Sequence, residues 1–158
     1  MRHKKLYREI ILFEKFIDGY KKLHNRRTFP RTLTSKLIEL LFRSKTRYIG
    51  SGAFKFVNKI RRHKTVLALK YGKRKSITSD IKAYNRLPRN IRNRYFGKIY
   101  WRSKYFLLQK YGKKANIANS ILIKLKNIGK KYGLTDIRRA NIRKVQGNFK
   151  IVDANIKK

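Results

Sequence analysis

The sequence predicts an α+β fold in which helices accompany an antiparallel sheet of five strands. Three observations predict it. Two segments before residue 46 have apolar residues at helical spacing, β-rich runs separated by glycines fill residues 46–111, and a helical segment from residue 117 precedes a hairpin pattern. Helices on either side of a run of short strands are typical of α+β proteins. With 158 residues, of which 41% are hydrophobic, the chain can build one domain with an appended helical segment.

Residues 1–45 are predicted to form an N-terminal segment of two helices. The first, over residues 5–24, has apolar residues three or four positions apart: Leu6, Ile10, Phe13, Ile17, Tyr20 and Leu23. Pro30 interrupts the pattern, and the second helix is predicted over about residues 33–43. The four acids of this segment are expected to be solvated helix positions: Glu9, Glu14, Asp18 and Glu39.

Residues 46–111 are predicted to form a strand lobe. Its expected elements are two strands around a tight turn within 47–60, a strand at 65–72, a helix at 76–88, and strands at 96–101 and 105–111. Ser76 or Ser79 is a suitable cap for the start of the helix, and Pro88 ends it.

Residues 112–158 are predicted to contain one long helix, a loop and a hairpin. The helix, over residues 117–132, has an apolar face made of Ile117, Ile121, Leu122, Leu125 and Ile128. The segments 141–145 and 148–152 flank "QGN", which is a hairpin signal.

The charge of the chain predicts a polyanionic partner. It has 45 Lys and Arg but only 7 Asp and Glu, a formal net charge of +38. Such a charge repels itself unless anions lie nearby, so we expect RNA or DNA, or an anionic or phosphorylated substrate. Tyr95, Tyr100 and Trp101 lie among basic residues, and they suit either base stacking or an ordinary half-buried sheet position.

The residue types exclude several kinds of site. The chain has no cysteine, which excludes disulfides, thiolate zinc sites and cysteine nucleophiles. Its three histidines lack the spacing of metal ligands. The apolar run near the N-terminus is too short for a signal peptide or a transmembrane segment, so we expect a cytoplasmic protein.

Only three acids follow residue 46: Asp80, Asp136 and Asp153. A carboxylate that binds Mg2+ or orients a hydroxyl cannot be replaced by lysine, because a hard cation needs oxygen ligands. Acids that remain in so basic a segment are therefore candidates for chemistry.

Four short motifs accompany these acids in order along the chain. They are "GSGAFKFV" at 50–57, "LALK" ending at Lys70, "TDIRRAN" at 135–141 and "IVDAN" at 151–155. They resemble the glycine-rich loop, strand-three lysine, catalytic loop and metal-binding segment of the protein kinase-like superfamily. The resemblance covers about residues 46–155 and implies a kinase-like strand lobe, here followed by a minimal, mostly helical second lobe.

The resemblance implies ATP and Mg2+ as cofactors and assigns roles to residues. Asp136 is implied to be the catalytic base, and Lys70, oriented by Asp80, to contact the phosphates. One of Arg138 and Arg139 is implied to neutralise the transferred phosphoryl group. Asn141 and Asp153 are the implied metal ligands, and the implied nucleotide-binding residues are Gly50, Ser51, Gly52, Val57, Ala68, Lys70, Asp80, Gln109 and Tyr111.

The sequence also departs from the family pattern. Lys55 replaces the third glycine of the loop, Asp80 replaces the usual Glu, and Ala154 and Asn155 follow the metal-binding Asp. No activation segment or later helical lobe follows, so a protein partner is one way to complete the short second lobe. We expect the two N-terminal helices, through Phe13, Phe16, Ile17, Leu37 and Leu41, to cover the back of the 117–132 helix. The competing arrangement places them against the strand lobe.

Two functions remain open from the sequence. The first is an ATP- and Mg2+-dependent phosphotransferase that acts on a hydroxyl acceptor of unknown identity. The second is a nucleotide-binding pseudokinase that serves as a basic nucleic-acid-binding or assembly module. The presence of every metal and base residue favours the first function.

Overall fold

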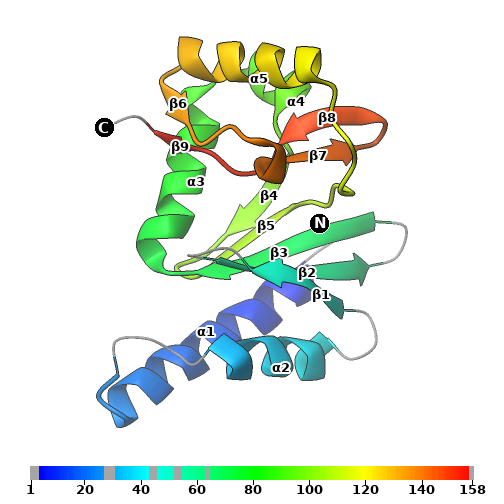
Figure 1. The fold of residues 1–158 in the computed structure, drawn as a ribbon. Helices are drawn as coiled ribbons and strands as arrows, with labels where there is room; N and C mark the ends of the chain where they lie inside the picture. The colour runs from blue at the N-terminus through cyan, green and yellow to red at the C-terminus, as the bar shows by residue number, and fades with distance from the viewer. Residues whose placement is uncertain (1–3, 27–30, 43–45, 52–54, 63–64, 157–158) are drawn as a thin grey trace.

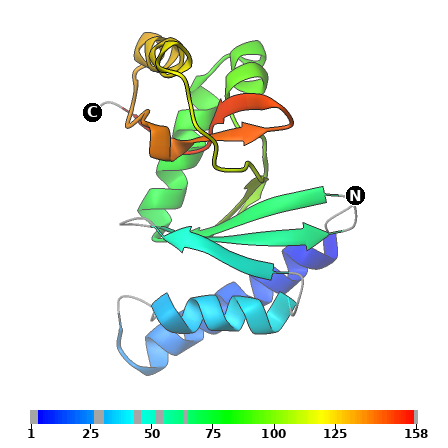
Figure 2. The same ribbon diagram turned by 45° about the vertical axis from the view of Figure 1, so that its right-hand side comes forward.

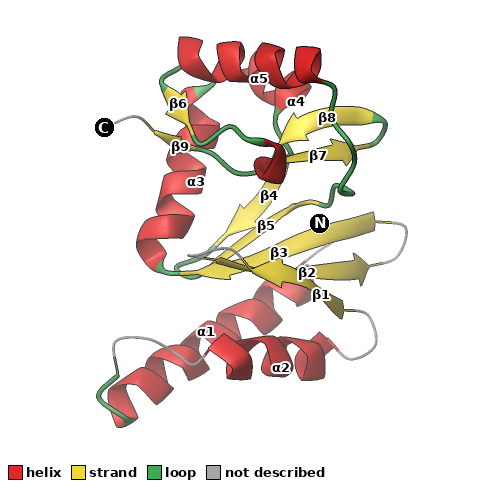
Figure 3. Ribbon diagram, in the orientation of Figure 1, coloured by secondary structure: helices red, strands yellow, loops and turns green. Residues whose placement is uncertain are grey.

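The computed structural model describes residues 4–26, 31–42, 46–51, 55–62 and 65–156 (Figure 1). Its elements are α1 (Lys4–Leu23), α2 (Arg31–Phe42), β1 (Thr46–Ser51), β2 (Lys55–Arg62), β3 (Thr65–Gly72), α3 (Arg74–Arg86), α4 (Arg89–Tyr95), β4 (Ile99–Arg102), β5 (Phe106–Lys110), α5 (Asn119–Lys131), β6 (Leu134–Thr135), the 3-10 turn η2 (Arg139–Asn141), β7 (Ile142–Val145), β8 (Asn148–Ile151) and β9 (Asn155–Ile156). The predicted α+β class is confirmed (Figure 3).

The main sheet has five strands in the order β1-β2-β3-β5-β4, and each neighbouring pair is antiparallel. The predicted five-stranded antiparallel sheet is therefore confirmed. Side chains alternate between its two faces. Ile60, Leu67 and Leu69 lie in the core on one face, whereas Val57 and Lys70 line a cavity on the other. The sheet thus separates a packing face from a site face.

Helices α1 and α2 cover the packing face (Figures 1 and 2). The buried stripe of α1, which includes Phe13 and Ile17, shares one core with Leu67, Leu69 and Phe106 of the sheet. Burying the four apolar side chains of this stripe stabilises the fold by about 6–12 kcal/mol before entropy is counted.

The predicted packing of the N-terminal helices behind the 117–132 helix is therefore wrong, and the competing arrangement is right. The packing face of the sheet is apolar and is stabilised by burial, and the apolar stripe of α1 buries it. Phe16 is exposed and Leu37 is only half-buried, so neither lies in the predicted interface with α5. The side chain of Leu41 lies outside the described residues.

Polar contacts also attach α1 to the sheet, at the turn between β4 and β5. Glu14 accepts hydrogen bonds of 2.6 Å from the Ser103 hydroxyl and the Tyr105 amide. Asp18 accepts one of 2.7 Å from the Tyr105 hydroxyl and lies 2.9 Å from the Lys104 ammonium. The prediction that Glu14 and Asp18 are merely solvated is wrong, because both acids fix the turn to the helix.

The aromatic residues Tyr100 and Trp101 have sheet roles. The Trp101 ring stacks on Tyr7 of α1 with centroids 5.0 Å apart and an 8° interplanar angle. Tyr100 packs against the same core. The sequence left base stacking and a half-buried sheet position open, and the structure shows the sheet position for Tyr100 and Trp101.

Helix α3 begins after Lys73 and makes no side-chain cap, so the predicted cap by Ser76 or Ser79 is wrong. The helix starts at Arg74, two residues earlier than predicted, which puts both serines inside it. The short helix α4 follows Pro88 and has no buried residue. Its sequence lacks an apolar stripe, which is why periodicity did not predict it.

The last segment folds as a hairpin and a two-residue strand pair. Strands β7 and β8 pair around Gln146 and Gly147, whose φ values of 49° and 85° suit a type I′ turn. This confirms the predicted hairpin. Strands β6 and β9 pair through Thr135 and Asn155, a contact that the sequence did not predict. The pairing brings together the loops that follow β6 and precede β9.

None of the helices in the described part of the chain has the length and apolar content needed to span a bilayer.

Candidate active site

A cavity of about 370 Å³ opens between the site face of the sheet and the loops that follow β6 and precede β9. It collects side chains from segments far apart in the sequence. Of the residues predicted for the site, those that line it are Val57, Ala68, Lys70, Gln109, Tyr111, Asp136, Arg138, Asn141 and Asp153.

The apolar floor of the cavity comes from neighbouring strands. Val57 lies opposite Lys70 in the β2–β3 register, and Ala68 lies opposite Gln109 in the β3–β5 register. The Gln109 side chain is buried and donates a 2.9 Å hydrogen bond to the Gly97 carbonyl. This bond ties β5 to the segment before β4 and fixes the strand end at which Tyr111 follows.

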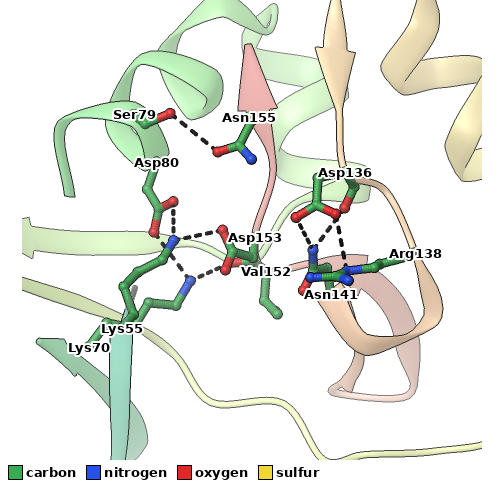
Figure 4. Close-up of polar contacts among 10 residues, drawn as sticks. All are labelled: Lys55, Lys70, Ser79, Asp80, Asp136, Arg138, Asn141, Val152, Asp153 and Asn155. Carbon is green, nitrogen blue, oxygen red and sulfur yellow. Dashed lines mark hydrogen bonds and ion pairs between the residues drawn. The ribbon is translucent and has the colours of Figure 1, made fainter. Parts of the chain in front are cut away.

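A corner of two lysines and two carboxylates lies at one end of the cavity (Figure 4). Lys70 Nζ lies 3.5 Å from Asp80 Oδ2, as the predicted ion pair requires, and also donates to the Val152 carbonyl. Lys55 Nζ lies 2.5 Å from Asp80 Oδ1 and 2.7 Å from Asp153 Oδ1. We refer to Lys55, Lys70, Asp80 and Asp153 as the charged corner.

The depth of each carboxylate decides how its pKa moves. The Asp80 side chain is only 4% exposed, and its burial raises its pKa despite the nearby lysines. The Asp153 side chain is 29% exposed, so burial opposes its ionisation less, and the charges of Lys70 and Lys55 lower its pKa. Burial also opposes the charge of Lys55, but Asp80 and Asp153 outweigh it and raise the pKa of Lys55. The outer carboxylate, Asp153, is therefore the one held as an anion at the cavity.

Asp136 lies across the cavity in a backbone conformation that few residues adopt. Its φ of 61° is in the left-handed region, where Asp is tolerated better than most side chains. Asn141 Nδ2 donates to the Asp136 carbonyl at 2.8 Å and to its carboxylate at 3.0 Å. Arg138 Nε lies 3.0 Å from the other carboxylate oxygen. Backbone strain held by such bonds is typical of functional loops.

Helix α5 supports this loop from behind. A Cβ built on Gly129 would lie 1.9 Å from Ile137 Cδ1, so the absence of a side chain allows the helix to approach the loop closely. Ile137 and Leu125 belong to the same buried cluster. The loop that carries Asp136 therefore rests on a packed helix.

The two arginines of the loop point to different places. The Arg138 side chain lines the cavity and is 68% exposed. Arg139 instead donates to the Ile117 carbonyl and to the Asn119 side chain, just before and at the start of α5. Of the two arginines offered for neutralising the phosphoryl group, Arg138 is the one that lines the cavity, because Arg139 anchors the loop to the helix.

The glycine-rich segment is described in part. Gly50 and Ser51 end β1, opposite Val57 and Phe56. The Ser51 side chain and the whole of Gly52 lie outside the described residues. The preceding Ile49 lines the cavity, which the sequence did not predict.

Lys55 is the main site residue that the sequence prediction missed. It was recognised only as a replacement for a glycine of the loop. A signal was present, because Lys55 precedes Val57 by two positions and residues two apart in a strand share a face. Arg143 and Lys110 also line the cavity, but in so basic a chain nothing distinguishes them from other cations.

The oxygen donors at the cavity fit a magnesium ion that is shared with phosphates. Asp153 and Asn141 both line the cavity and offer the hard oxygen ligands that Mg2+ prefers. Within the described ranges, no group of three or more His, Cys, Asp or Glu side chains gathers in one place. A dedicated all-protein metal cage is therefore not a fit, whereas one or two protein ligands suffice when phosphates and water supply the others.

Neither a protein-family model nor a curated protein matches the chain.

Proposed function

We propose that this protein is an ATP- and Mg2+-dependent phosphotransferase with a kinase-like fold. The observation that carries the proposal is the convergence of Lys70, Asp136, Asn141 and Asp153 on one cavity, with Asp80 paired to Lys70 beneath it. These five residues come from four separate parts of the chain and include all three acids after residue 46. A purely structural ion-pair network would not need Asp136 and Asn141 on the opposite wall.

Lys70 is the proposed phosphate-binding lysine, and Asp80 positions it. The ammonium is anchored by Asp80 and by the Val152 carbonyl, so its side chain is fixed before a nucleotide arrives. Because Lys70 and Asp80 are both buried, water screens the charge of Lys70 less than it screens the charge of a surface lysine. Val57 and Ala68 supply an apolar floor of the kind that a purine ring fills.

Asp153 and Asn141 are the proposed ligands of the metal. A Mg2+ ion held by these two side chains would supply positive charge to offset that of the phosphates. The lowered pKa of Asp153 supports this assignment, since a metal ligand has to be ionised.

Asp136 is the proposed base for the acceptor hydroxyl. Asn141 and Arg138 hold both of its carboxylate oxygens, and the side chain is 34% exposed towards the cavity, so it is oriented but reachable. When the Asp136 carboxylate accepts the hydroxyl proton, the acceptor oxygen bonds to the γ-phosphorus of ATP, the bond from that phosphorus to the β-phosphate breaks, and ADP leaves. Arg138 lies at the same place with an exposed guanidinium and is the proposed neutralising charge for the transferred group.

The decisive experiment is a transfer assay with labelled ATP across protein, RNA and sugar acceptors, together with calorimetry of nucleotide binding. The proposal expects magnesium-dependent ATP binding and label on at least one acceptor class. Nucleotide binding without transfer to any of the three classes would favour the pseudokinase alternative. An ATP-dependent reaction of this kind is expected in the cytoplasm.

One observation supports the alternative of a nucleic-acid-binding module. Helices α4 and α5 lie together at the end of the molecule away from α1, and every ionisable side chain of both except Tyr95 is basic. An acid-free face of this kind suits a phosphate backbone or an acidic protein partner. The two functions are compatible, because the cavity and this face involve different residues.

A further inference from the structure

We propose that Lys55 is a second phosphate-binding residue. Its ammonium bridges two carboxylates in the free protein and moves to the phosphates when a polyphosphate enters the cavity. This inference rests on the proposed nucleotide site and extends it to Lys55, the residue that departs from the kinase-like pattern at the third glycine of the loop. It begins from one geometric fact. The ammonium of Lys55 contacts Asp80 and Asp153 at 2.5 and 2.7 Å, so a single cation bridges the inner and the outer carboxylate.

The position of Lys55 places it on the correct face of the sheet. It is the first residue of β2 and lies opposite Gly72 of β3, which has no side chain to compete for the space. Residues two apart in a strand share a face, so Lys55 lies beside Val57 and diagonal to Lys70. Both lysines therefore approach the cavity from the same side.

The net charge of the charged corner is balanced without a ligand and becomes strongly negative when a polyphosphate binds. Its two lysines and two carboxylates sum to zero net charge when all are ionised. A polyphosphate adds several negative charges, and a divalent ion held by Asp153 would satisfy the carboxylate that Lys55 now neutralises. The Lys55 ammonium would then be repelled by the divalent cation beside it and attracted by the phosphate oxygens, because like charges repel and opposite charges attract.

The accessibility of Lys55 agrees with such an exchange. Its side chain is 12% exposed and lines the cavity, whereas the Lys70 side chain is 5% exposed and is fixed by the Val152 carbonyl as well as by Asp80. Asp80 and the Val152 carbonyl thus hold the Lys70 ammonium in one position. Among the described residues, the Lys55 ammonium is held by the two carboxylates alone, and it reaches new positions by rotation of its flexible side chain.

Calorimetry of four ligands with Lys55→Met tests the proposal. The probes are MgATP, MgADP, AMP and inorganic tripolyphosphate. We expect Lys55→Met to weaken MgATP and tripolyphosphate binding by about tenfold or more and to leave AMP within about threefold, because only the outer phosphates lose a contact. Lys55→Arg should retain part of the affinity. Lys15→Met, which removes a charge from an exposed position on α1, is the matched control and should bind like the wild type.

Removal of Lys55 leaves two carboxylates close together, which could prevent folding. The charge-balanced double variant Lys55→Met/Asp153→Asn avoids that outcome. Its reference is the single variant Asp153→Asn, which keeps Lys55. Measured with tripolyphosphate in the absence of metal, the double variant should bind about tenfold more weakly than its reference.

Each outcome decides something. If Lys55→Met binds MgATP as well as the wild type or more tightly, Lys55 is only a counter-ion of the carboxylates and the inference is wrong, while the proposed function stands. Equal losses for ATP and AMP also overturn it, because they indicate damage to the whole cavity. If the wild type binds tripolyphosphate through Lys55 but no adenine nucleotide, the inference stands and the nucleotide function falls. Binding of none of the four probes overturns both.

Discussion

The Asn141 amide lies 3.0 Å from the Asp136 carboxylate and 2.8 Å from the Asp136 carbonyl, so one side chain restrains both the backbone and the carboxylate of its partner. Asn141 is buried, whereas Asp136 is partly open to the cavity. Gly and Asn adopt the left-handed backbone conformation of Asp136 more readily than Asp does, so the conformation alone does not require a carboxylate at this position. The pairing therefore suggests that the direction of the Asp136 carboxylate matters for function.

Asp136→Asn should separate binding from transfer. Asn tolerates the left-handed conformation and keeps the shape of the side chain, but it cannot accept the acceptor's proton. We expect kcat to fall by about 10²–10⁴-fold while the affinity for MgATP changes by less than about threefold. Transfer from labelled ATP and calorimetry measure the two quantities, and unaltered transfer would remove Asp136 as the base.

Asp153→Ala should abolish magnesium-dependent nucleotide binding. Asp153 is the exposed carboxylate of the charged corner and the proposed metal ligand, and no other acid of the corner is open to the cavity. Titration of ATP with and without Mg2+ gives the measurement. Glu39→Ala on α2 removes a carboxylate at an exposed position and is the matched control. Equal enhancement of ATP binding by Mg2+ in wild type and Asp153→Ala would contradict the assignment.

The order of the motifs allowed much of the site to be predicted, because chemistry restricts residue types more tightly than folding does. Asp80, Asp136 and Asp153 are noticeable only since the rest of the chain has so few acids. Lys55 and Ile49 were missed for the opposite reason. Basic and apolar residues are common in this chain, and the position of Lys55 two residues before Val57 stands out only when the β2–β3 register places Val57 opposite Lys70.

The fold was predicted best where the pattern is local. Strand β3 and the β7–β8 hairpin lie where periodicity and the Gln146–Gly147 turn place them. The packing of α1 on the sheet could not be predicted, because an apolar stripe specifies that a helix is covered but not by which partner. The β6–β9 pair was missed because two-residue strands have no periodicity, and only tertiary contact defines them.

Asn58→Leu should stabilise the fold. Asn58 is 0% exposed on the packing face, and neither its amide nitrogen nor its oxygen has a hydrogen-bond partner among the described residues. Leu has a similar shape and removes the cost of burying an unpaired amide, so we expect the free energy of unfolding to rise by about 1–2 kcal/mol. Denaturant unfolding measures it. Asn58→Ala, which leaves a cavity, is the comparison, and a loss of stability in Asn58→Leu would show that the amide is satisfied in solution.

The α4–α5 face should determine the salt dependence of nucleic-acid binding. Lys124, Lys126 and Lys130 are exposed on α5, and each phosphate contact that one of them makes contributes about 0.7 to the slope for a single strand. Changing all three to Gln should therefore lower the slope of log affinity against log salt by about 2. The control removes the same charge from exposed positions of α1, at Lys5, Lys15 and Lys22. Equal effects of the two triple variants would indicate binding by net charge without a preferred face.

The attachment of α1 at the β4–β5 turn should depend on pH through Asp18. Burial opposes the charge of Asp18, but hydrogen bonds from Lys104 and Tyr105 outweigh it and lower its pKa below the ordinary value of 3.8. A lowered pKa means that the stabilisation is present above pH 3.8 and is lost as the pH falls through the folded-state pKa. Asp18→Asn should thus cost about 0.5 kcal/mol of unfolding free energy at about pH 7, as expected for an exposed ion pair, and less at about pH 2.5. Denaturant unfolding of both proteins at the two pH values measures the difference, and a cost that does not change with pH would assign the effect to the Tyr105 hydrogen bond instead of the charge.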